Sequence, residues 1–174
     1  MTPGPLYRPR PRNPAPSGRI QPQPMETEML GFLKEKIAGG AKRLNGRADL
    51  LEAACAACVL VGAADGNLDD DEAGVALDRL LNHEALSKAF TSSQIESAFD
   101  KQAKRAKAGI SGRVGLKREV EEARAKSTAE DLEMVFVIAI DVAGADGSIG
   151  DKEMKALRDL GTSLGGLSPD RYLN

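Results

Sequence analysis

Aromatic residues, histidine and cysteine are all scarce in this chain. Its 174 residues include no Trp, two Tyr and four Phe, so few rings are present to stack on bases, and we do not expect nucleic-acid binding. The single histidine, His83, has no evident Ser or Cys partner, and we expect it at a helix end or on the surface. Two cysteines, Cys55 and Cys58, exclude a disulfide framework. They also leave a zinc site two ligands short, so we interpret them as small buried hydrophobes.

A long hydrophobic run is also absent. The longest apolar stretch, Ala53 to Ala64, is too short for a membrane span, which needs about 20 residues. The first residues are rich in proline where a secretory signal would be apolar. We therefore expect a soluble, cytoplasmic protein with no membrane span. No constellation of catalytic residues stands out, and we do not expect an enzyme.

Residues 1–24 differ sharply in composition from residues 25–174. They hold eight of the nine prolines and no acidic residue. Their only charged side chains are four arginines, Arg8, Arg10, Arg12 and Arg19, whereas the remainder carries a net charge of −6. Proline at this density excludes helix and central strand. We predict an extended arm over residues 1–24 that binds protein partners, and a folded domain over residues 25–174.

Helical periodicity runs through the rest of the chain. The pattern predicts a first helix that ends at Gly39-Gly40 and a second, buried helix from Leu50 to Ala64. Capping boxes are expected at Asp69 with Glu72 and at Ser127 with Glu130. Three glycines, Gly109, Gly112 and Gly115, are expected to break the chain before a charged helix over about residues 114–126. The sequence therefore predicts an all-α fold of about seven helices.

An acidic turn occurs twice. Residues 64–72, ADGNLDDDE, return as residues 145–153, ADGSIGDKE, and each copy follows an apolar helix. On the register of an EF-hand, Asp65 and Asp146 take position five, and Glu72 and Glu153 take position twelve. Positions one and three lack acidic residues in both copies, which rules out a working EF-hand. The turns are either structural joints or parts of a cation site.

Helix capping explains many of these residues without a metal. Gly ends a helix readily, and acidic residues favour the positive end of the next helix. Capping does not explain Asp65 and Asp146, which follow the negative end of a helix. The candidate metal ligands are carboxylates of the two turns. The ion that we expect them to bind is Ca²⁺ or another divalent cation. They are Asp65, Asp69, Glu72, Asp146, Asp151 and Glu153.

The two turns, together with the closing residues 164–169, LGGLSP, resemble the tellurite-resistance TerB family over about residues 31–172. The resemblance implies an all-helical fold of two pseudo-symmetric halves and an acidic face that binds divalent cations. It also implies links to chemical stress, phage defence and membrane-associated complexes, with no enzymatic activity. The chain departs from the family in its arm and in Gly150, where the first copy has Asp69.

Two functions therefore stay open. The first is a non-enzymatic, TerB-like binding module that depends on a cation and belongs to stress resistance. The second is a structural or assembly subunit, for instance of a phage particle, in which residues 1–24 dock on neighbouring subunits. The location would then be the virion rather than the cytoplasm.

Overall fold

The computed structural model describes residues 24–66, 68–145 and 147–173, with side chains from residue 34 onward. This part of the chain contains nine helices and no strand, which confirms the all-α class. The helices are α1 Pro24–Leu44, α2 Ala48–Gly62, α3 Asp70–Asn82, α4 Glu84–Ala89, α5 Ser92–Lys107, α6 Ile110–Lys126, α7 Ala129–Ala143, α8 Asp151–Ser163 and α9 Asp170–Leu173. Two short helices, α4 and α9, bring the number above the seven expected. None of the described helices is long and apolar enough to cross a bilayer.

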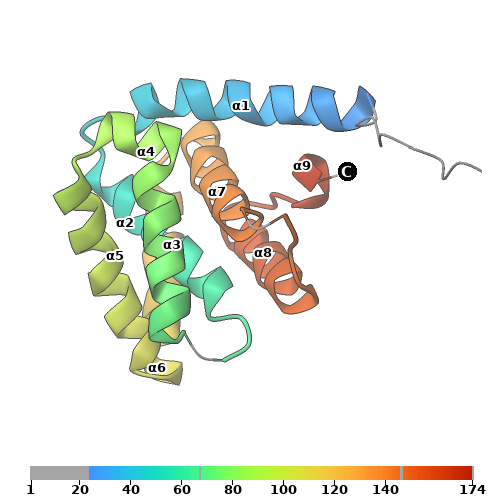
Figure 1. The fold of residues 1–174 in the computed structure, drawn as a ribbon. Coiled ribbons are helices and arrows are strands. Elements are labelled where there is room, and N and C mark those ends of the chain that lie inside the picture. The colour runs from blue at the N-terminus through green and yellow to red at the C-terminus, as the bar shows by residue number, and fades with distance from the viewer. Residues whose placement is uncertain (1–23, 67, 146, 174) are drawn as a thin grey trace, which may run out of the picture.

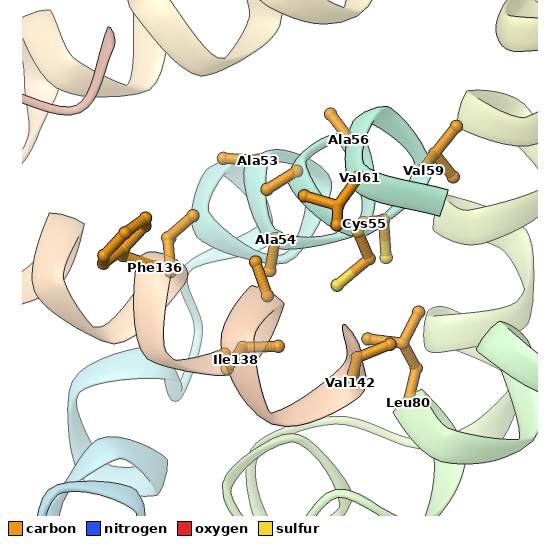
Figure 2. Packing of buried hydrophobic residues seen from close by; sticks show 14 of the residues in the cluster. Ala53, Ala54, Cys55, Ala56, Val59, Val61, Leu80, Phe136, Ile138 and Val142 are labelled. Atoms are coloured by element: carbon orange, nitrogen blue, oxygen red, sulfur yellow. The ribbon is translucent and has the colours of Figure 1, made fainter. Parts of the chain in front are cut away.

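Helix α2 lies at the centre of the molecule. It packs against α5, α6 and α7, while α1 runs across one end of the bundle and contacts α4 and α7 (Figure 1). The buried face of α2 consists largely of small side chains, including Ala53, Ala54 and Cys55, which have no exposed surface. Small side chains let neighbouring helices approach closely, and larger ones from α7, such as Phe136 and Ile138, fill the space beside them (Figure 2). The predicted interpretation of the cysteines as buried hydrophobes is confirmed.

The two halves of the chain use the same sequence of elements. In each half a buried helix (α2 or α7) leads through a glycine turn into an amphipathic helix (α3 or α8). The two buried helices pack directly against each other, and each contacts the amphipathic helix of its own half. This arrangement places both acidic turns at the same ends of two neighbouring helices.

Two predicted helix boundaries are wrong because of close packing. Helix α1 continues through Gly39 and Gly40 to Leu44, and a Cβ atom at Gly40 would collide with the side chain of Met134 on α7. Helix α6 begins at Ile110, so that only Ala108 and Gly109 separate it from α5, and Gly109 has a φ of 80°. Glycine inside a helix costs about 1 kcal/mol, which packing against a neighbour offsets.

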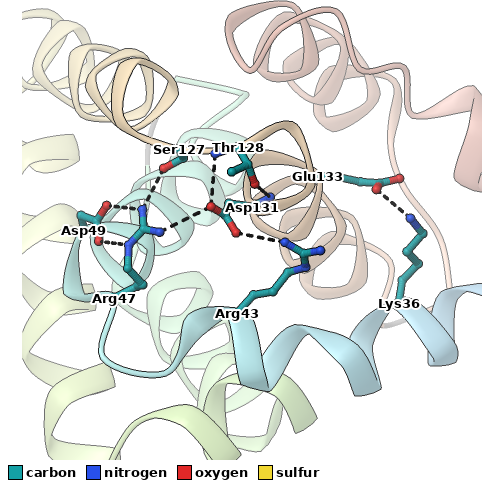
Figure 3. Close-up of polar contacts among 8 residues, drawn as sticks. All are labelled: Lys36, Arg43, Arg47, Asp49, Ser127, Thr128, Asp131 and Glu133. Carbon is teal, nitrogen blue, oxygen red and sulfur yellow. Dashed lines mark hydrogen bonds and ion pairs between the residues drawn. The ribbon is translucent and has the colours of Figure 1, made fainter.

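The predicted capping box of α7 is also wrong by one residue. Thr128 rather than Ser127 is the N-cap, and its hydroxyl accepts a hydrogen bond from the Asp131 amide. The Asp131 carboxylate in turn accepts from the Thr128 amide at 3.2 Å. Asp131 replaces Glu130 because it is buried and also binds Arg47 and Arg43 (Figure 3). One carboxylate thereby joins α7 to α1 and to the start of α2.

Candidate functional site

The first acidic turn is built by ordinary helix-end chemistry. Helix α2 ends at Gly62, and Gly66 adopts a φ of 111° while its amide donates to the Ala63 carbonyl at 3.0 Å. Asp69 then caps α3, with its Oδ1 accepting from the Glu72 amide at 2.8 Å. Glu72 Oε2 accepts from the Asp69 amide at 3.1 Å, which confirms the predicted capping box. One oxygen of each carboxylate is therefore already bonded to the backbone.

The second turn repeats this geometry with one acceptor missing. Gly147 has a φ of 90°, and its amide donates to the Gly144 carbonyl at 2.9 Å. Glu153 Oε2 accepts from the Gly150 amide at 2.9 Å, as Glu72 does in the first turn. Gly150 has no side chain to accept a bond from the start of α8, so only half of the capping box forms. The two turns are equivalent in backbone and unequal in carboxylates.

The last glutamates of the two turns converge on one pocket. Glu72 and Glu153, which occupy the same position in the repeat, both line a cavity of about 340 Å³ between α2, α3, α7 and α8. Asp71 lines the same cavity and adds a third carboxylate. We call this cavity, with its three acidic residues, the acidic pocket. The convergence follows from the packing of α2 against α7, which brings the two halves together.

The walls of the acidic pocket are apolar and include one cation. Small and branched side chains of α2 and α7 form its floor, among them Val61 and Val142. The Arg79 guanidinium also lines the pocket and donates to the Val142 carbonyl at 2.7 Å, at the end of α7. This contact satisfies a carbonyl that the helix end leaves without an intrahelical partner. It also places a positive charge beside the three carboxylates.

The other predicted ligands lie elsewhere or beyond the described residues. Asp65 lines a different cavity, between α2, α6 and α8. Asp69 serves as the N-cap, and Asp151 is exposed in the first turn of α8. Asp146 lies outside the described residues, as do the four arginines of the arm, Arg8, Arg10, Arg12 and Arg19. Among the residues that the structure describes, no three His, Cys, Asp or Glu side chains are placed to hold a metal ion.

Sequence reasoning missed two residues of the acidic pocket. Asp71 was one of several acidic residues in a run, and only the rotation of α3 shows that it faces the cavity. Arg79 gave no signal, because a single cation on an amphipathic helix is typical of a solvated face. The basic segment over residues 101–126 also has the composition of such a face. Several of its cations do form surface ion pairs, for example Arg105 with Glu119 at 2.6 Å and Lys101 with Glu52 at 3.1 Å.

The three remaining candidate groups, two cysteines and one histidine, are buried. Burial, with a contribution from Glu52, raises the pKa of the Cys55 thiol to about 12, and burial also raises that of Cys58. Both thiols are therefore protonated and weakly nucleophilic at neutral pH. His83 lies at the end of α3, as expected, but it is buried rather than on the surface, with 4% of its area exposed. Its Nε2 atom is 3.5 Å from a carboxylate oxygen of Asp141.

The described geometry is that of an all-helical domain with a duplicated turn, and comparison with known proteins agrees. The family of the tellurite resistance protein TerB matches residues 51–172, more than two thirds of the chain. The chain belongs to the TerB family, and the resemblance seen in the two turns is confirmed. The match begins inside α2 and contains both turns, the acidic pocket and the cavity that Asp65 lines. Searches of curated proteins and of solved structures gave no match.

Proposed function

We propose that this TerB-family domain is a non-enzymatic binding module whose acidic pocket takes a divalent cation, Ca²⁺ or a similar ion, and links that ion to a protein partner in stress resistance. The observation that carries the proposal is the convergence of Glu72 and Glu153, from two separate turns, on one cavity with Asp71. Helix capping requires a glutamate in each turn but does not require the two to share a pocket. Oxygen ligands of this kind suit calcium.

The expected affinity is low. One carboxylate oxygen of Glu72 and one of Glu153 already accept hydrogen bonds from backbone amides. Arg79 adds a positive charge to the pocket. The described carboxylates do not form a cage of three ligands, so the ion would keep several water ligands. We expect a Kd of about 1 mM, in the range of weak calcium modules. At about 10 mM calcium, binding would then stabilise the fold by about 1.4 kcal/mol.

Thermal unfolding with and without calcium tests the proposal. A stabilisation of about 1.4 kcal/mol would raise the melting temperature by roughly 3–6 °C. The double variant Glu72→Gln/Glu153→Gln is the informative one, because glutamine also serves at the third position of a capping box. It keeps the helix caps and removes two charges, so the calcium shift should disappear while the fold remains.

The matched control is Asp100→Asn, which removes one exposed carboxylate from α5. Its calcium shift should equal that of the wild type. A wild-type melting temperature that does not change at about 10 mM calcium, against an equal ionic strength of NaCl, would remove the cation from the proposal. If calcium shifts the melting temperature of the Glu72→Gln/Glu153→Gln variant as much as that of the wild type, the ion binds elsewhere on the surface.

A second candidate function, an assembly subunit, rests on the composition of residues 1–24. Four arginines without an acidic residue precede a domain of net charge −6, a pattern that favours contact with acidic surfaces of neighbouring subunits. We propose deletion of residues 1–23 as the test. Loss of complex formation in cell extracts, with an unchanged melting temperature, would support assembly through the arm, and an unchanged complex would refute it.

A further inference from the structure

A second cavity, of about 500 Å³, shares no lining residue with the acidic pocket. It is lined by residues of the end of α2, the first half of α6 and the second half of α8. Its floor is apolar and includes Leu60, Val120 and Leu160. Neither the capping of the acidic turn nor the proposed cation site uses this space. We call it the α6 groove.

One wall of the α6 groove exposes large apolar side chains. Ile110 is 76% exposed and Val114 is 56% exposed, and both line the groove. They are the two most exposed of the four large hydrophobic residues on the surface of the described chain. Since residues four apart share one face of a helix, they form a short apolar ridge along the edge of α6. Contiguous apolar surface of this kind is typical of interaction sites.

The α6 groove is lined by cations on one side and by carboxylates on the other. Lys117 and Arg113 belong to α6, whereas Asp159 belongs to α8 and Asp65 to the acidic turn. Arg113 is held in place, because its guanidinium donates to the Gly66 carbonyl at 2.6 Å. Lys117 and Asp159 form no ion pair with any residue in the described ranges, although both line the same groove. Lys117 and Asp159 are therefore one cation and one anion of the groove whose side chains no other described residue already holds.

We infer that the α6 groove binds a second copy of this chain in a two-fold symmetric dimer. In such an interface each surface must be complementary to itself, so that residue i of one copy meets residue j of the other and the reverse. The α6 groove meets this condition twice. Its apolar ridge of Ile110 and Val114 can enter the groove of the partner copy, and Lys117 of each copy can face Asp159 of the other. A partner of a single charge would leave Lys117 or Asp159 without its counterion.

Charge reversal tests this pairing directly. We would measure the oligomeric state of the full chain by sedimentation equilibrium from about 10 µM to 1 mM, a range that covers the weak affinity expected of a small interface. The variants Lys117→Glu and Asp159→Lys each turn both symmetry-related contacts from attraction to repulsion. Each variant alone should raise the dimer Kd at least about tenfold. An equimolar mixture of the two should restore the wild-type Kd, because both contacts become attractive again in the heterodimer.

The mixture distinguishes contacts between copies from contacts within one copy. A charge pair inside a single chain cannot be repaired by mixing two different chains. The variant Val114→Glu should also abolish the dimer, whereas Val75→Glu, on an exposed site of α3, should leave it intact. Circular dichroism would establish that all four variants are folded.

Two results would overturn the inference. The first is a wild type that stays monomeric at about 1 mM, and the second is a mixture that stays monomeric although both variants are folded. If a monomeric wild type also binds an apolar fluorescent probe and Val114→Glu does not, the α6 groove would be assigned to a small ligand instead.

Discussion

Gly112 and Gly115 lie in the same helix, α6, but the structure predicts opposite effects when each is replaced by alanine. A Cβ atom at Gly115 would meet no other atom within 4 Å. A Cβ atom at Gly112 would lie 2.6 Å from the carbonyl carbon of Arg105 and closer still to its oxygen. Arg105 is in the last turn of α5, where its carbonyl accepts the Ala108 amide at 3.1 Å. Gly112 is therefore the residue that lets α6 fold back closely against α5.

The expected magnitudes follow from these contacts. Gly115→Ala should stabilise the protein by about 0.5–1 kcal/mol, because alanine is the better helix former and its methyl group has room. Gly112→Ala should destabilise it by about 2 kcal/mol or more, since the new methyl group meets backbone, which cannot rotate away as a side chain can. The two variants should differ by about 3 kcal/mol. For a domain of this size, that difference corresponds to about 6–12 °C in melting temperature.

Urea unfolding at equilibrium, followed by circular dichroism, measures both free energies on one scale. The two substitutions are chemically identical and share a helix, so differences in the unfolded state largely cancel. A Gly112→Ala variant as stable as Gly115→Ala would refute the packing of α6 on α5 described here. It would also restore the sequence-based interpretation, in which both glycines lie in a break between helices.

Two further predictions concern buried ionisable groups. Asp131→Asn should cost about 1.5–3 kcal/mol, because Asp131 is a buried carboxylate bound by Thr128 and Arg47, whereas the exposed control Asp100→Asn should change stability little. Burial raises the pKa of Asp131, but the hydrogen bonds with Thr128 and the charges of Arg47 and Arg43 lower it overall. The ionised carboxylate therefore stabilises the fold above pH 3.8, and this stabilisation is lost as the pH falls below that value. Urea titrations between pH 5 and 2.5 should therefore show a smaller loss in the variant. For His83, burial lowers the pKa below 6.5, opposed by Asp141 and Glu84, so the unfolded chain takes up the proton first. Stability should fall as pH drops from 7.5 to 5.5, and His83→Gln should weaken that dependence; an equal dependence in the variant would contradict it.

The helical class and the order of the elements could be predicted from the sequence because periodicity and capping are local. Asp69 and Glu72 are three residues apart, and their box formed as predicted. The boundaries at Gly40 and Gly112 could not be predicted, because they depend on Met134 and Arg105, which lie far away in the sequence or across a turn. The α7 cap failed for the same reason. Asp131, rather than Glu130, forms the capping box because it also contacts Arg43 of α1 and Arg47 at the start of α2. These contacts are distant in sequence, so a local pattern cannot predict them.

Only part of the candidate site could be predicted from the sequence, and there is a physical reason why some of the predicted residues lie elsewhere. Internal repetition indicated that Glu72 and Glu153 are equivalent, and equivalence in a two-fold arrangement of helices brought them to one pocket. The same reasoning grouped Asp65 with them, yet Asp65 faces the α6 groove. Residues 63–66 line the α6 groove, whereas Asp71 and Glu72, in the first turn of α3, line the acidic pocket. Alignment with the EF-hand loop assigns each residue a position in the sequence, but it does not determine which cavity each side chain faces.

The two halves of the domain are equal in backbone but unequal in charge. Asp69 of the first turn corresponds to Gly150 of the second, and Arg79 of α3 corresponds to the buried Leu160 of α8. Among the described charged residues that line the acidic pocket, the first half supplies Asp71, Glu72 and Arg79. The second half supplies one, Glu153. A symmetric cation site would need equal donors from both halves. The asymmetry instead implies that the ion we propose would be held mainly by the first turn, with Glu153 as a contact from the second.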